Sequence, residues 1–106
     1  MKRIFAVLCL VPGLLFAAGA GDAAKGKDLY AAKCKGCHGA AGEGNQGIAK
    51  AMKVELRHLG SKEVQAKTDD ELKKVVTGGT GKMKAVTGVA GADLDNVIAF
   101  VRTLKQ

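Results

Sequence analysis

Two cysteines and a histidine stand within five residues of this chain, in the order Cys34-Lys35-Gly36-Cys37-His38. On a helical turn, a spacer of two residues directs both thiols to the same side, where they can add to the two vinyl groups of one porphyrin. The histidine follows directly, so its imidazole can reach the iron from that side. This spacing is the attachment pattern of c-type haem, and it requires the chain to fold around a large rigid group.

Three other uses of these residues are open on residue type alone. A thioredoxin-like redox pair would need strands around it, and the sequence has no strand pattern. A zinc site would combine Cys34, Cys37 and His38 with the distant His58, although structural zinc sites normally use two separated ligand pairs. A disulfide between the two cysteines would close a loop too small to stabilise the fold much. The spacing favours covalent haem over all three.

The composition after residue 20 explains why a large apolar group is needed. Residues 21–106 contain 35 hydrophobic residues, of which 13 are alanines, so 22 larger side chains remain to build a core. Tyr30 and Phe100 are the only aromatic residues among them. A chain of this length is close to the limit of what folds unaided. A buried haem would supply the missing apolar surface.

Residues 1–20 have the features of a secretory signal peptide. Lys2 and Arg3 form a positive start, an apolar stretch follows, and a small-x-small cleavage pattern ends at Ala20. The alternative is an uncleaved anchor, but the apolar stretch is shorter than the ~20 residues that span a bilayer. We therefore expect cleavage after Ala20 and an exported, periplasmic protein with no stable membrane insertion. Residues 21–106 would then form one domain.

The pattern after residue 20 predicts helices and no strands, so the expected fold class is all-α. Helix caps and apolar residues at 3- and 4-residue spacing predict three helices, over residues 22–33, 68–77 and 92–105. Asp22 is the expected cap of the first, and Thr68 and Glu71 form a capping box at the start of the second. Residues 48–59 are ambiguous and predict one or two helical turns that end at Gly60.

An iron bound by His38 on one face has a second axial position. Met83 lies in a glycine-rich loop 45 residues beyond His38, and a loop of that reach can pass over the opposite haem face. Met52 lies in an apolar turn, where core packing is the better interpretation. His58 suits either a surface position or a contact with the haem carboxylates. Met83 is the expected ligand, and the other two remain alternatives.

Residues 22–106 resemble the small monohaem class I cytochromes c. The resemblance rests on four landmarks that occur in the family's order. They are the Gly26 and Tyr30 pair, the haem motif at residues 34–38, the Gly-Lys-Met segment at residues 81–83, and the last helix with Phe100.

The resemblance implies an all-α helical shell around one covalently attached haem c. Cys34 and Cys37 would hold the haem, while His38 and Met83 would ligate its iron. Residues 21–106 would be the cytochrome c domain, with its first and last helices crossing at close range. The implied activity is one-electron transfer.

The chain departs from the family in its prolines. The family usually has one proline after the haem motif and one directly after the ligand methionine, but here Lys84 follows Met83 and no proline occurs after residue 12. The sequence therefore does not identify the carbonyl that orients His38, and the Met83 loop is expected to be more mobile. Since tryptophan is absent, Arg57, His58 or backbone groups must meet the haem carboxylates.

The charge balance indicates the kind of partner. Loss of Lys2 and Arg3 with the leader would lower the formal net charge from +7 to +5. A positive balance suits an acidic partner, and nucleic acid is not expected for an exported chain without interleaved aromatic and basic residues. Four lysines flank the expected haem ligands and would surround the haem edge: Lys33, Lys35, Lys82 and Lys84. We expect a monomer that docks acidic redox proteins on this Lys-rich haem edge.

The expected function is a soluble one-electron carrier between respiratory redox partners, and not an enzyme. A methionine sulfur on the iron favours Fe(II), and an iron with six ligands has no position for a substrate. The alternative is a small haem enzyme or gas sensor, peroxidase-like or NO-binding, with a labile sixth ligand. A subunit of a larger respiratory complex is a further possibility.

Overall fold

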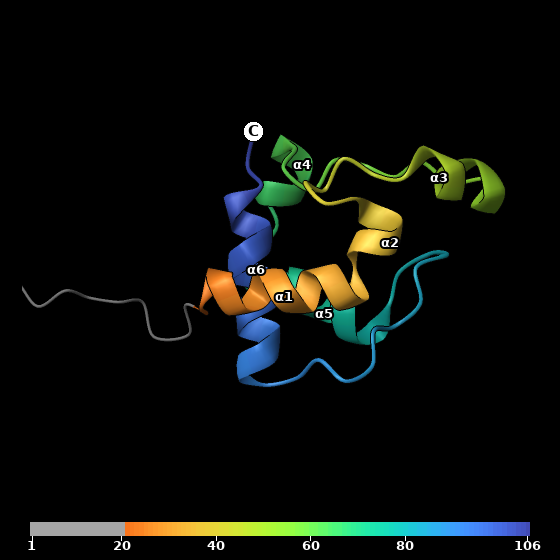
Figure 1. Ribbon diagram of the computed structural model, residues 1–106. Coiled ribbons are helices and arrows are strands. Elements are labelled where there is room, and N and C mark those ends of the chain that lie inside the picture. The colour runs from red at the N-terminus through yellow and green to blue at the C-terminus, as the bar shows by residue number, and fades with distance from the viewer. Residues whose placement is uncertain (1–20) are drawn as a thin grey trace, which may run out of the picture.

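The structure, a computed structural model, describes residues 21–106, so the expected signal peptide lies outside the described residues. This part of the chain forms helices and no β-sheet, which confirms the all-α fold class (Figure 1). The helices are α1 (Ala23–Lys33), α2 (Lys35–His38), α3 (Gln46–Met52), α4 (Lys62–Gln65), α5 (Asp69–Gly78) and α6 (Ala92–Thr103).

The crossing of α1 over α6 organises the fold (Figure 1). Gly26 allows the two backbones to touch, because a Cβ atom at this position would lie 1.8 Å from the carbonyl oxygen of Asn96. The Asn96 side chain in turn accepts a hydrogen bond of 2.7 Å from the backbone N–H of Asp22. The Asp22 carboxylate caps α1, as the sequence predicts, by accepting from the N–H groups of Ala24 and Lys25.

An aromatic pair fills the crossing next to this contact. The rings of Tyr30 in α1 and Phe100 in α6 lie 4.9 Å apart at an angle of 53°. The buried Tyr30 hydroxyl donates a hydrogen bond of 2.6 Å to the carbonyl of Gly39, directly after α2. Burial, together with the nearby Cys34 and Glu43, raises the pKa of Tyr30 to about 12, so the hydroxyl stays protonated and donates at neutral pH. This bond fixes the position of α2 relative to the crossing.

Further contacts attach α5 and the loops to α6. The guanidinium of Arg102 donates to the Asp69 carboxylate at 2.8 Å and to the carbonyls of Gln65 and Lys67 at 2.8 and 2.6 Å. It therefore joins the end of α6 to α4 and to the start of α5. Close to the other end of α6, the buried Val89, Leu94 and Val97 pack with half-buried apolar residues that include Leu29 and Val76.

The predicted helices agree with the structure at their starts. The capping box of Thr68 and Glu71 is present, α5 is capped by Gly79, and the apolar stripe of α6 from Leu94 to Val101 is buried. The prediction for residues 48–59 is wrong in its extent. α3 ends at Met52, where Lys53 takes a left-handed conformation (φ 54°), and the following residues up to α4 are irregular. The short helix α4 is not predicted, because four residues are too few to show a helical period.

Gly26→Ala should destabilise the protein by about 1–3 kcal/mol, since the added methyl group would overlap the backbone of α6. Denaturant unfolding of the holoprotein measures this change. Gly78→Ala is the matched control, because a Cβ atom at the end of α5 meets nothing within 4 Å. Equal unfolding midpoints for the two variants would contradict a close backbone contact between α1 and α6.

Candidate haem site

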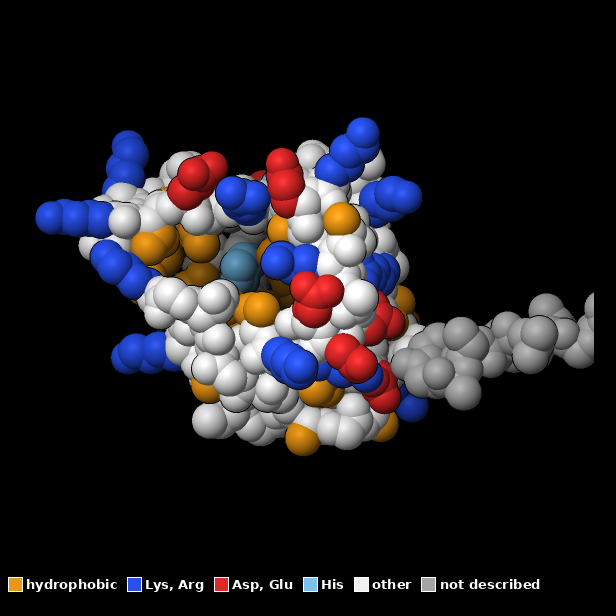
Figure 2. Space-filling model, turned by 180° about the vertical axis from the view of Figure 1, so that it is seen from behind, with side chains coloured by type: hydrophobic (Ala, Val, Ile, Leu, Met, Phe, Trp, Pro, Cys, Tyr) orange, Lys and Arg blue, Asp and Glu red, His pale blue; other side chains and the backbone are white. Residues whose placement is uncertain are grey.

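A cavity of about 820 Å³ lies between α2, the α3 region, α5 and the loop around Met83. Eight aliphatic side chains line its walls: Ile48, Val54, Leu56, Leu59, Val64, Leu72, Val75 and Val86. Figure 2 shows a hollow with hydrophobic walls, a histidine inside it, and Lys and Arg side chains around it. The cavity lies in the upper part of the volume range of small-molecule and cofactor sites, roughly 300–1,000 Å³.

The single turn of α2 brings Cys34, Cys37 and His38 to this cavity. The carbonyl of Cys34 accepts hydrogen bonds from the N–H groups of Cys37 and His38, at 3.2 and 2.9 Å. The chain that follows returns over the turn, where Gly44 donates to the carbonyl of His38 at 2.6 Å and Asn45 donates to that of Cys37 at 2.8 Å. Backbone hydrogen bonds within the turn and from the chain that follows therefore hold it in place. The side chains of Cys34, Cys37 and His38 all line the same cavity.

The Cys34 thiol does not have the lowered pKa of a redox-active thiol, and the two cysteines are not part of a metal-binding cluster in the described chain. Both cysteines are free, and burial, with a smaller effect of the adjacent Cys37, raises the pKa of the Cys34 thiol. A redox-active thiol instead has a lowered pKa. Within residues 21–106, no three His, Cys, Asp or Glu side chains are grouped to hold a metal ion, so the zinc alternative with His58 has no support.

One ring nitrogen of His38 has no hydrogen-bond partner in the described chain. Its Nδ1 atom is buried and forms no hydrogen bond, and burial lowers the pKa of the ring. Leaving a buried nitrogen unpaired costs about 1–3 kcal/mol, so such atoms normally have a partner. A neutral imidazole at an apolar cavity, next to two free thiols, fits a covalently held haem with an iron ligand.

Met83 reaches the cavity from a loop on another side. The loop after α5 closes in a tight turn, in which Thr80 and Met83 exchange backbone hydrogen bonds of 3.0 and 2.8 Å. At its base, the N–H of Val86 donates to the carbonyl of Val76 at 2.7 Å. Met83 is half-buried and lines the cavity.

The two alternative axial ligands lie in different surroundings. Met52 also lines the cavity, but the residue is 37% exposed, so the interpretation of Met52 as a core residue is wrong. It stands at the end of α3, which leaves it on the surface. His58 is not among the residues that line the cavity, and its Nδ1 atom accepts a hydrogen bond of 2.9 Å from the N–H of Gly60.

Charged side chains line the cavity as well, and nearly all of them are positive: Lys33, Arg57, Lys67, Lys82 and Lys84, against the single acid Glu55. Sequence reasoning singled out all the positive residues except Lys67. The sequence instead groups Lys67 with Lys62 and Lys105, away from the haem edge, and this is wrong because no local pattern places the residues after α4 beside the haem motif. Lys35, the remaining lysine of the expected haem edge, lies in α2 and is exposed, but does not line the cavity.

Comparisons with known proteins agree with this site. A family model described as cytochrome c oxidase, cbb3-type, subunit III matches residues 21–101. Cytochrome c-554(547) of Halothiobacillus neapolitanus is 34% identical over 91 residues, which cover 81% of this chain and all of that protein. Cytochrome c6 of Picosynechococcus sp. is 33% identical over 113 aligned positions, covering 95% of this chain and 92% of that protein.

Among solved structures, the KustC0563 c-type cytochrome has a similar fold, with a TM-score of 0.62 over 76% of this chain and 98% of its own. Its sequence is 24% identical, so this likeness concerns the fold alone. The family match and the two relatives show that the chain belongs to the c-type cytochromes, as a small class I member. It carries covalently bound haem c and is a haem-based electron carrier.

A further finding concerns membranes. Among the helices formed by residues 21–106, none combines the length and the apolar character needed to cross a bilayer.

Replacing both thiols, with Cys34→Ala and Cys37→Ala together, should leave little folded protein, because the walls of an 820 Å³ cavity then lose their covalently held partner. Thermal unfolding followed by far-UV circular dichroism measures this loss. A cooperative transition in haem-free material would show that the helices pack adequately by themselves.

Proposed function

We propose that Cys34 and Cys37 form the thioethers to the haem and that His38 and Met83 are the axial ligands of its iron. The observation that carries this proposal is that all four side chains line one cavity: Cys37 and His38 from α2, Cys34 from the residue that caps α2, and Met83 from a separate loop. Haem supplies the Fe(II)/Fe(III) couple for one-electron transfer. The chain would contribute two fixed ligands, which keep the change in geometry between the two oxidation states small.

Each ligand is supported by the backbone around it. The carbonyls of Cys37 and His38 accept from Asn45 and Gly44, so the α2 turn resists rotation. Met83 is held by the turn that begins at Thr80. With both axial positions taken, no position remains for a substrate, which supports an electron carrier and not a haem enzyme.

Arg57 is our candidate partner for the haem carboxylates. It lines the cavity, whereas His58 does not, and His58 already uses Nδ1 as an acceptor. A guanidinium binds a carboxylate through two parallel hydrogen bonds, which suits this role.

The chain is proposed to be exported to the periplasm, with the leader removed after Ala20. The family match begins at residue 21, and the backbone of Gly21 already packs on α6, where a Cβ atom would lie 2.2 Å from the backbone of Asp95. The family match thus starts directly after the expected cleavage pattern. This agreement supports a cleaved leader ahead of one cytochrome domain.

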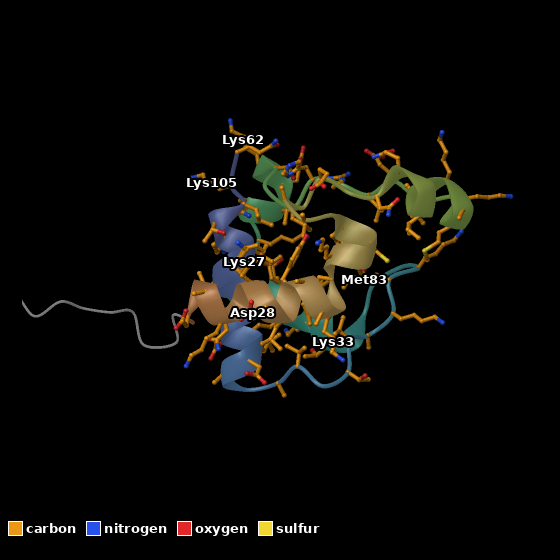
Figure 3. All side chains as sticks on the ribbon, viewed as in Figure 1. Lys27, Asp28, Lys33, Lys62, Met83 and Lys105 are labelled. Carbon is orange, nitrogen blue, oxygen red and sulfur yellow. The ribbon has the colours of Figure 1, made fainter. Side chains whose placement is uncertain are left out.

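The proposed partners are acidic redox proteins that dock at the Lys-rich haem edge. Lys33, Lys82 and Lys84 line the cavity, and in Figure 3 Lys33 and Met83 lie at the lower middle and right of centre, whereas Lys62 and Lys105 lie at the upper left. A concentration of positive charge at the mouth of the site steers an acidic partner to it and favours fast, weak encounters. We propose that the protein does this as a monomer.

Met83→Ala should leave the haem covalently bound and remove the sulfur ligand. The measurement is the sulfur-to-iron charge-transfer band in the optical spectrum of the ferric holoprotein. The wild type should have this band and the variant should lack it.

Met52→Ala is the matched control, because Met52 is the other methionine at the cavity. It should keep the band. If Met52→Ala loses the band and Met83→Ala keeps it, the sixth ligand is Met52. A wild type without the band would favour the alternative of a haem enzyme or gas sensor with an open sixth position.

Charge reversal at the haem edge should slow association with an acidic redox partner. The test variant changes Lys33, Lys35 and Lys84 to Glu, and the control variant changes Lys27, Lys62 and Lys105. The wild-type rate should fall steeply with ionic strength, because charges are screened over about 10 Å at 0.1 M salt. Stopped-flow electron transfer measures both effects. Equal slowing by the two variants, or a rate that does not change with salt, would refute docking at this edge.

A further inference from the structure

Two segments that form opposite walls of the cavity extend from the body of the molecule. One is the α3 arm, residues 45–57, and the other is the Met83 loop, residues 79–86 (Figure 1). The principal helix contacts join α1 to α6, α1 to α2, and α5 to α6, and α3 is not part of them. Each segment is fixed at its base by backbone hydrogen bonds, the arm through Asn45 and the loop through Val86.

One hydrogen bond joins the outer ends of these two segments. The ammonium nitrogen of Lys82, in the turn next to Met83, donates to the backbone carbonyl of Met52 at 2.6 Å. These two residues are 30 positions apart in the sequence. The bond therefore closes a long loop of chain around the cavity, directly beside the proposed ligand.

The carbonyl of Met52 is a suitable acceptor for a cation. It belongs to the last residue of α3, and within residues 21–106 no backbone N–H donates to it. The N–H of Lys53 turns back to Ala49 and Lys50 instead, because Lys53 is in the left-handed conformation. Carbonyls at a helix C-terminus are commonly satisfied by lysine, and their partial negative charge favours the ammonium group.

The turn from Thr80 to Met83 closes the tip of the loop on itself, but residues 80–85 form no backbone hydrogen bond to the rest of the described chain. Gly79 and Gly81 both adopt positive φ angles, of 74° and 54°. At Gly79 a side chain would collide with the backbone, since a Cβ atom would lie 2.6 Å from the carbonyl oxygen of Met83. Glycines add freedom to the chain, and no proline follows Met83 to reduce it.

We propose that Lys82 is a positioning residue that ties the Met83 loop to the α3 arm through the Met52 carbonyl. The bond holds two walls of the cavity together, and it limits the excursions of Met83 away from the haem. Its effect on Met83 as an iron ligand rests on the proposed function, whereas the link between the loop and the arm does not.

Hydrogen exchange of the holoprotein, resolved by peptide, tests the link directly. Lys82→Ala should speed the exchange of amides in residues 46–54 and 80–86 together by about fivefold, which corresponds to ~1 kcal/mol. Lys84→Ala is the matched control, since it removes the same charge on the other side of Met83. Its exchange should match that of the wild type. Lys82→Arg keeps a donor of similar reach and should restore most of the protection.

A second measurement tests how readily imidazole replaces Met83 on the iron. The rate at which imidazole enters the ferric protein and displaces the sulfur band should rise about fivefold in Lys82→Ala and remain unchanged in Lys84→Ala. Wild-type exchange in Lys82→Ala, or equal changes in both alanine variants, would overturn the proposal. If the wild type has no sulfur band, the His/Met assignment fails, while the exchange comparison still decides whether Lys82 links the two segments.

Discussion

The structure depends on apolar walls that cannot bury themselves against one another. Of the eight aliphatic side chains that line the cavity, only Leu72 is buried in the described chain, and the others are half-buried. The fully packed parts of the molecule are small clusters beside the α1–α6 crossing. Covalently bound haem in this cavity would complete the core on the remaining side, and the cofactor would then act as a structural element as well as the redox centre.

The crossing of α1 and α6 makes such a cofactor-dependent fold possible. It gives the chain one region that is packed by protein alone, through Gly26, Tyr30 and Phe100. The hydroxyl of Tyr30 then connects this packed region to α2 by its hydrogen bond to the carbonyl of Gly39. The thiols and His38 are thus held on a turn that is anchored to the packed region, which would prearrange them for the proposed attachment to one porphyrin.

The features that the sequence predicts well are local ones. The cap at Asp22, the capping box of Thr68 and Glu71, and the apolar period of α6 each need only a few neighbouring residues. The haem motif is local as well, since its spacing alone places two thiols and an imidazole on one turn. These signals suffice for the fold class and for three of the four proposed haem-binding residues.

The features that the sequence does not predict depend on contacts between distant segments. Lys67 lines the cavity because it follows α4, to which the irregular chain after α3 leads. Neither segment has a periodic apolar pattern from which this position could be predicted. Met52 has the apolar neighbours of a core residue, yet it lies on the surface because α3 stands away from the crossing. The bond of Lys82 to Met52 also joins separate parts of the chain, and lysine carries no sequence signal for a single carbonyl partner.

The hydrogen bond of Lys82 to Met52 matters because the chain has no proline after residue 12. A proline after the ligand methionine, usual in the family, would restrict the loop in the unfolded and folded states alike. Here Lys84 occupies that position. The loop therefore carries a positive charge beside the cavity and lacks the conformational restriction that a proline would impose. A hydrogen bond from Lys82 can recover part of the lost restriction in the folded state only. The lysines on the two sides of Met83 would then have separate tasks, with Lys84 free to meet a partner and Lys82 engaged with the α3 arm.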